Sequence, residues 1–135
     1  MKDLADRFAE EAERLIGTRF RLHGRDPVLG LDCIGVAACA LCRAGAAIDA
    51  PTGYALRNAL IQRHVERATA SGLVEVTGRI RRGDILLVRT GPGQDHLLVA
   101  VGCKRFVHAH AGLRQVVSQT GLSGWTVRHH LRLTQ

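Results

Sequence analysis

Cys33 is the first residue of this 135-residue chain whose position suggests chemistry. It follows Asp32, a residue type that caps helices, and it begins the apolar run 33–42, so we expect it in the first turn of a buried helix. Unpaired backbone N–H groups and the helix dipole favour a thiolate there, and the same N–H groups could receive an oxyanion. A nucleophilic cysteine also needs a base, and His96 opens an expected strand. The two residues predict nucleophilic catalysis by a thiol.

An imidazole base needs a third polar group to hold it in the right tautomer, and two histidines on the next expected strand could supply it. If strands 96–102 and 105–110 form a hairpin with a three-residue loop, His96 stands opposite His110 and diagonal to His108 on one face. A two-residue loop would place His96 on the opposite face. The spacing alone therefore leaves the choice between His108 and His110 open.

The histidine and cysteine spacings also allow metal binding, but they match no standard site. His108 and His110 share one face of a strand and could bind zinc with a cysteine added. Cys39 and Cys42 form a C-x-x-C pair, yet they lie inside an apolar helical run and no second pair follows. We expect small buried thiols at these two positions, and neither a metal nor another cofactor.

The elements that must position these residues fall into two halves. Helices are expected at 3–16, from 33 to about 45 and at 55–70, with a long connection over 17–31. The second half changes to short strands, expected at 73–76, 84–90, 96–102, 105–110, 114–118 and 126–133. Helices followed by an antiparallel meander predict a single α+β domain over residues 1–135.

Composition and charge exclude several classes of protein. No apolar run approaches the length of a membrane-spanning helix. The charged start does not resemble a secretory signal, which predicts synthesis in the cytoplasm without a signal peptide. The net charge of +7 favours an anionic partner. Nucleic acid is not the expected one, because the arginines are spread along the chain and the aromatic residues (three Phe, one Tyr, one Trp) are too few for a base-stacking surface.

Four short segments follow one another in an order that is shared with one enzyme family. Residues 16–20 (IGTRF) are similar to a G-T-x-Y segment, 31–36 (LDCIGV) to a D-C-S-G-L nucleophile motif, and 82–86 (RGDIL) to an x-G-D-L strand. Residues 95–101 (DHLLVAV) with 106–109 (FVHA) are similar to H-V-G-I-Y followed by F-I-H-A. Over residues 3 to 132, the chain resembles the NlpC-type papain-like cysteine peptidases, which cut the peptide stems of bacterial cell wall.

The resemblance implies a papain-like α+β fold, in which N-terminal helices pack on an antiparallel sheet of five to six strands. It implies Cys33 as the nucleophile, His96 as the base and His108 as the orienting residue, so it chooses between the two histidines by analogy. The implied activity is that of a cysteine endopeptidase, a peptidoglycan hydrolase acting on stem peptides without a cofactor.

The resemblance also implies substrate or oxyanion contacts around Phe20, Asp32 and Ile34, and two of these residues depart from the family pattern. Phe20 stands where the family has a tyrosine, so a hydroxyl donor is absent. Ile34 stands where the family has a serine. A lost oxyanion donor can cost about 10²–10³ in rate. The implied catalytic trio is nevertheless intact, so we expect an active enzyme.

Within the family, the chain most resembles the short stand-alone branch of phages, prophages and gene transfer agents. The long connection from Phe20 to Cys33 and the strand after Trp125 carry this likeness. It implies tail-like proteins as further partners and incorporation into a phage or phage-like particle, with no membrane partner. Two alternatives are an amidase or acyl transferase on the same fold, and a non-catalytic component of a tail particle.

Overall fold

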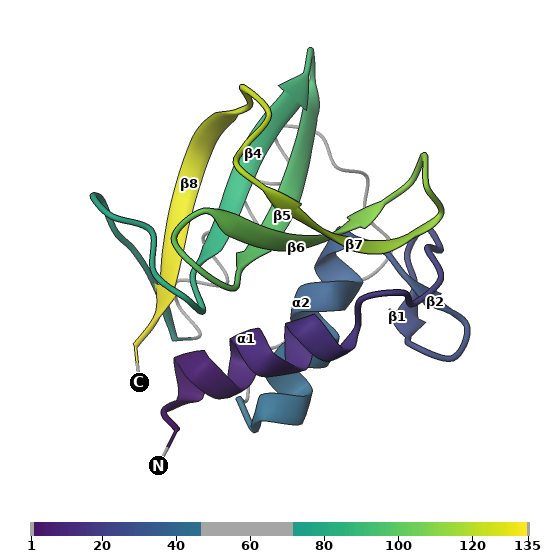
Figure 1. Ribbon diagram of the computed structural model, residues 1–135, viewed down its shortest axis with the longest axis horizontal. Coiled ribbons are helices and arrows are strands. Elements are labelled where there is room, and N and C mark those ends of the chain that lie inside the picture. Colours follow the sequence, from purple (N-terminus) through teal and green to yellow (C-terminus); the bar gives the residue numbers. More distant parts are fainter. Residues whose placement is uncertain (1, 47–71, 135) are drawn as a thin grey trace.

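The fold is seen in a computed structural model, which describes residues 2–46 and 72–134. In these ranges two helices lie on one side of a six-stranded antiparallel sheet, as expected for an α+β domain (Figure 1). The helix expected at 55–70 lies outside the described residues. Within the described part of the chain, no helix is both long and apolar enough to cross a membrane.

The sheet has the strand order β3-β8-β4-β5-β6-β7, and every neighbouring pair is antiparallel. β4 to β7 form the expected meander, but β8 returns to the middle of the sheet. The meander was therefore the wrong expectation for the first and last strands, because β8 lies between β3 and β4 and pairs with both. The bounds are β3 (Leu73–Glu75), β4 (Ile85–Gly91), β5 (Gln94–Ala100), β6 (Arg105–His110), β7 (Gln115–Thr120) and β8 (Thr126–Leu133).

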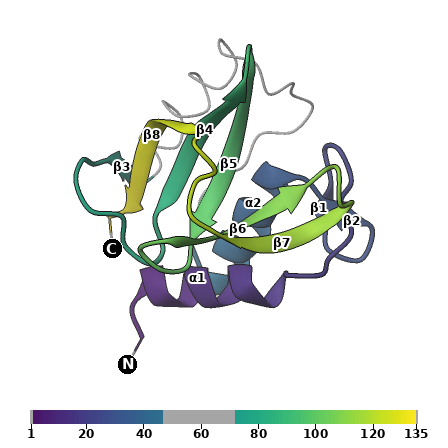
Figure 2. The same ribbon diagram turned by 45° about the horizontal axis from the view of Figure 1, so that its top comes forward.

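Both faces of the sheet are buried. Alternate residues such as Val99 and Val107 belong to the main core cluster, which also contains the apolar faces of the two helices. Their neighbours along the strands, such as Leu98 and Phe106, form a second cluster against Trp125. The sheet is strongly twisted, so β6 and β7 cross the direction of β4 at a steep angle (Figures 1 and 2).

The two helices are capped as their sequences indicate. In α1 (Leu4–Arg14), the carboxylate of Asp3 accepts a hydrogen bond from the Asp6 N–H, and Phe8 is fully buried. α2 (Cys33–Ala44) ends at Gly45, which adopts a left-handed φ of 90°. α2 contacts α1 as well as β5 and β6, which makes it the central helix expected from its apolar sequence.

The RGD segment just before β4 joins the helices to the sheet. Gly83 has a φ of +94°, and a Cβ there would lie 2.7 Å from Ala5 of α1. The buried Asp84 carboxylate accepts from Arg132 (2.9 Å) and lies 2.6 Å from His130 Nε2, so it fastens β8 to the start of β4. These contacts give a structural role to the x-G-D-L motif, which the family resemblance had singled out.

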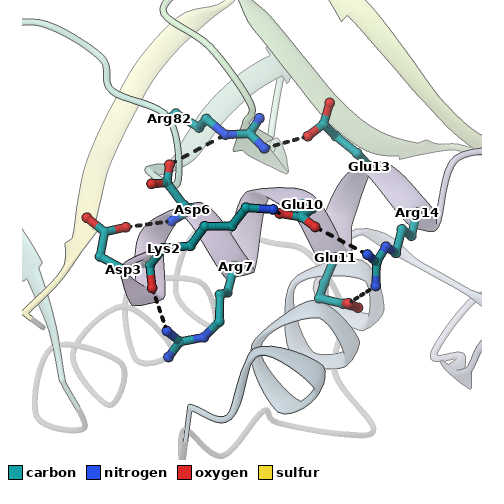
Figure 3. A network of polar contacts seen from close by, with 9 residues as sticks. All are labelled: Lys2, Asp3, Asp6, Arg7, Glu10, Glu11, Glu13, Arg14 and Arg82. Carbon is teal, nitrogen blue, oxygen red and sulfur yellow. Dashed lines mark hydrogen bonds and ion pairs between the residues drawn. The ribbon is translucent and has the colours of Figure 1, made fainter.

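Arg82, from the same segment, reaches the exposed face of α1 (Figure 3). Its guanidinium pairs with Asp6 at 3.6 Å and with Glu13 at 2.7 Å. Because these pairs are exposed, each contributes at most about 1 kcal/mol, and their main effect is to orient α1. Further pairs on this face join Lys2 and Arg14 to Glu10 and Glu11.

Candidate active site

The β5–β6 hairpin brings the candidate histidines to one face of the sheet. Val99 pairs with Val107 and Ala100 with Phe106, and the Val101 N–H donates to the Arg105 carbonyl at 2.9 Å. This register is that of the three-residue loop, one of the two alternatives that the spacing left open. The backbone pairing of β5 with β6 stops at Val99, so the two strands separate toward His96, where the imidazoles meet.

His96 hydrogen-bonds with His108 and not with His110. The distance from His96 Nε2 to His108 Nδ1 is 2.7 Å, and the two rings meet edge-on with centroids 4.8 Å apart. His110 instead accepts the N–H of Leu113 on its Nδ1 at 3.1 Å, which closes the turn after β6. The geometry therefore agrees with the pairing that the family resemblance implied.

A third side chain and an indole complete this cluster, and the sequence pattern pointed to neither as part of a site. Gln119 of β7 places its Oε1 2.8 Å from His108 Nε2. Trp125 packs edge-on against both rings, with centroids 6.2 Å from His96 and 6.0 Å from His108. Trp125 thus covers the hydrogen bond between the histidines, and a low local dielectric strengthens such a bond. The only feature of the sequence that could have drawn attention to Trp125 is that it is the one tryptophan of the chain.

Burial keeps both imidazoles neutral near neutral pH. Burial, with smaller contributions from His108 and His110, lowers the pKa of His96 to about 3. Burial also lowers the pKa of His108, although its hydrogen bond to Gln119 acts in the opposite direction. A neutral imidazole has one ring nitrogen that accepts a proton, as a general base requires.

Cys33 lies at the first turn of α2, as expected, but its thiol is deeply buried. The residue is 2% exposed and packs with Ile34 and Leu97. Burial, followed by the nearby Asp32 carboxylate, raises the pKa of the Cys33 thiol to about 12, although backbone N–H groups of Leu97 and Ile34 favour the thiolate. The helix start favours a thiolate, but desolvation outweighs it here and favours the neutral thiol.

The thiol and the base come from elements that touch, but they are not hydrogen-bonded to one another. The sulfur faces the backbone N–H of Leu97, the residue that follows His96 on β5. Among the described residues, no hydrogen bond joins Cys33 to the His96 ring. Catalytic hydrogen bonds are often longer before substrate binds. The absence of this hydrogen bond in the free protein is therefore compatible with a thiol–imidazole pair that forms on binding.

Asp32 anchors the start of α2, the helix that carries Cys33. Its Oδ1 accepts from the Gly35 N–H and from Arg25 Nη1, each at 2.8 Å, and its Oδ2 accepts from the His23 N–H at 2.9 Å. These contacts hold the connection 17–31 against the start of α2. This connection also contains a short hairpin, β1 (Arg25–Asp26) with β2 (Gly30–Leu31), that was not expected. A carboxylate in this role accepts hydrogen bonds and does not supply an oxyanion donor.

Phe20 lies at an open pocket of about 460 Å³ that also contains the histidine pair. Its N–H donates to the Arg114 carbonyl at 2.9 Å, which fixes this part of the connection beside β7. Cys33 is not among the described residues that line the pocket, in keeping with its burial. The described lining consists of Phe20, Leu22, Thr90, Gln94, Asp95, His96, His108, Ala109, His110, Ala111, Gly112 and Trp125.

The remaining cysteines do not form a site. Cys39 is half-buried and Cys42 is exposed, so the expectation of buried thiols is wrong for Cys42. The apolar sequence of α2 concealed that this part of the helix faces outward. Both ring nitrogens of His108 are engaged with His96 and Gln119. In the described part of the chain, no group of three or more His, Cys, Asp or Glu residues could hold a metal ion.

The fold and the site together define a small α+β domain with a thiol at a helix start beside a pair of linked histidines. The family model of the NlpC/P60 family matches residues 17–133, so the chain belongs to this family. The comparison with curated protein sequences gave no match.

Solved structures show the same fold. NlpC2 from Trichomonas vaginalis superposes with a TM-score of 0.72 and 20% identity, over 98% of this chain and 47% of that one. The NlpC/p60 domain of the peptidoglycan hydrolase SagA gives 0.66 and 21%, over 96% and 98% of the two chains. The P60 domain of an antigen from M. avium subspecies paratuberculosis gives 0.65 and 16%, over 97% and 94%. The chain thus spans about half of the length of the T. vaginalis protein.

Proposed function

We propose that this chain is a thiol peptidase that hydrolyses peptide bonds in the stem peptides of peptidoglycan. The observation that carries the proposal is the hydrogen bond between His96 and His108 at an open pocket, next to Leu97, which packs against Cys33. Membership of the NlpC/P60 family supports the same conclusion, as does the likeness to a domain of the peptidoglycan hydrolase SagA.

The reaction follows from these three residues. When substrate binds, the Cys33 thiol transfers its proton to the free ring nitrogen of His96, and the sulfur attacks the peptide carbonyl carbon. The backbone N–H of Cys33 and a neighbouring donor hold the oxyanion. His96 then gives the proton to the leaving amine, the C–N bond breaks, and a thioester remains on Cys33. Water, deprotonated by His96, hydrolyses the thioester and restores the thiol.

The apolar residues of the pocket and the net charge of the whole chain favour a partly apolar and anionic substrate. Phe20 and Trp125 line the pocket with apolar surface, and the chain carries a net charge of +7. Stem peptides carry free carboxylates, which suit a basic protein. The bond that we propose for cleavage lies next to D-glutamate and a diamino acid.

Product analysis with defined muropeptides tests this function. We expect the wild type and the Cys42→Ala variant, which removes an exposed thiol, to add one water and produce a new amino terminus within the stem peptide. The Cys33→Ala variant should release no product. Release of the whole stem from its sugar would instead identify an amidase, and transfer of the peptide to another amine an acyl transferase. Cleavage by Cys33→Ala at the wild-type rate would exclude Cys33 as the nucleophile.

A place in a phage or phage-like tail is the finer part of the proposal, with synthesis in the cytoplasm and incorporation into the particle. It is supported by the long connection from Phe20 to Cys33 and by the strand after Trp125, which resemble the short tail-associated branch of the family. Particles that carry Cys33→Ala should assemble normally and open peptidoglycan poorly. Particles with unchanged function would make this chain a non-catalytic tail component.

A further inference from the structure

Gln119 lies behind the histidine pair and touches neither the pocket nor Cys33 in the contacts described above. Its amide makes two hydrogen bonds, from Nε2 to the Gly121 carbonyl at 2.9 Å and between Oε1 and His108 Nε2 at 2.8 Å. A backbone carbonyl can only accept, so the NH₂ group must face Gly121 and the amide oxygen must face His108. The amide orientation is therefore fixed by the turn that follows β7.

This orientation determines where His108 carries its proton. Gln119 Oε1 can only accept, so His108 must donate from Nε2. A neutral imidazole has one N–H, which leaves a lone pair on His108 Nδ1. That atom lies 2.7 Å from His96 Nε2, so His96 must donate from Nε2. The accepting lone pair of His96 is then on Nδ1.

We propose that Gln119 is a positioning residue, which sets the tautomer of His108 and through it places the proton of His96 on Nε2 and the basic lone pair on Nδ1. The register of β6 and β7 makes this possible, because Gln119 pairs with Phe106, two residues from His108 on the same face of β6. The inference extends the proposed function from three residues to a fourth. The assignment of the two tautomers, however, does not depend on which substrate is cleaved.

Loss of the acceptor at position 119 would release this arrangement. His108 could then carry its proton on Nδ1 and present an N–H to His96. His96 Nε2 would have to accept, and the proton of His96 would move to Nδ1, the atom that must take the thiol proton. Such an imidazole cannot act as the base, so the rate should fall in proportion to the population of this tautomer.

Nitrogen-15 NMR of imidazoles in uniformly labelled protein tests the proposal, because protonated and unprotonated ring nitrogens have well-separated chemical shifts. Near pH 8, without substrate, the wild type should show protonated Nε2 and unprotonated Nδ1 in both His96 and His108. Protonated Nδ1 in either ring of the wild type would overturn the proposal. This result needs no variant and no activity.

Two variants and a control extend the test. Gln119→Leu should shift His108 toward the other tautomer and lower kcat by about 10–100-fold with little change in KM. Gln119→Glu keeps an acceptor at His108 and should retain the wild-type tautomers and most of kcat. Gln115→Leu, an exposed change on the same strand, should match the wild type. Unchanged tautomers in a folded Gln119→Leu variant would overturn the proposal, whereas correct tautomers without peptide cleavage would overturn only the proposed function.

Discussion

Burial of the candidate nucleophile and the candidate base dominates this site at the scale of single residues. The Cys33 thiol and the His96 imidazole are both neutral in the free protein, because each is removed from water. In the proposed reaction, this neutral pair transfers its proton only when substrate has arrived. Such a site protects the thiol from oxidation and alkylation until it is used.

Alkylation of the four thiols tests this resting state. With a small reagent between about pH 6 and 8, we expect the exposed Cys42 and Cys103 to react first and Cys33 last, because the pKa of Cys33 is raised and its sulfur is covered. Peptide mass spectrometry locates the label. Fast labelling of Cys33 near pH 6, abolished by His96→Ala, would show a resting thiolate–imidazolium pair and contradict this account.

The lowered pKa of His96 also predicts how stability changes with acid. The unfolded chain takes up this proton below the ordinary histidine pKa of 6.5, whereas the folded chain resists it until about pH 3. The stabilisation is therefore present above pH 6.5 and is lost as the pH falls through this window. The wild type should lose about 1 kcal/mol more free energy of unfolding per pH unit than His96→Gln. Equal slopes in urea titrations would show that His96 titrates normally.

At the scale of the elements, the site depends on two close approaches of backbone. The Gly24 carbonyl would lie 2.1 Å from a Cβ at Gly35, so the connection 17–31 can pack on the first turn of α2 only because Gly35 has no side chain. The second approach joins Ala5 of α1 to Gly83, ahead of β4. The first contact fixes α2 relative to the connection that carries Phe20. The second fixes α1 relative to the start of β4.

Paired glycine variants measure the second approach. Gly83→Ala would introduce both an unfavourable positive φ and a clash with Ala5, whereas Gly78→Ala has a similar φ of +95° and open space around it. We expect Gly83→Ala to be the more destabilising by about 1–3 kcal/mol in urea unfolding. If both variants lose the same stability, the packing of α1 on Gly83 contributes nothing.

The sequence allowed prediction of the elements whose signals are local. Asp32 before an apolar run indicated the start of α2, and alternating residues indicated most of the strands. Long-range partners could not be predicted, because they depend on register and on chain reversal. Gln119 reaches His108 only through the β6–β7 pairing, and Trp125 covers the histidines only because the segment before β8 folds back across the sheet.

At the scale of the whole molecule, the same limit explains why the raised pKa of the Cys33 thiol could not be predicted. The helix start alone favours a thiolate, and this part of the expectation followed from local sequence. The desolvation that reverses it comes from β5 packing on α2, a contact between residues more than 60 positions apart. That His96 hydrogen-bonds with His108 and not with His110 likewise required the tertiary structure, and an orienting role for His108 stays a prediction from the family likeness.

In the proposed reaction, Cys33 forms a thioester with the acyl part of a stem peptide. Hydroxylamine attacks a thioester to give a hydroxamate and a free thiol, so it should divert part of the product during turnover of a defined muropeptide. We predict that mass spectrometry will find this hydroxamate at the residue whose carbonyl is cleaved, with the wild type and with Cys42→Ala, and not with Cys33→Ala. Cleavage that yields only the carboxylic acid in hydroxylamine, and that persists in Cys33→Ala, would contradict the account.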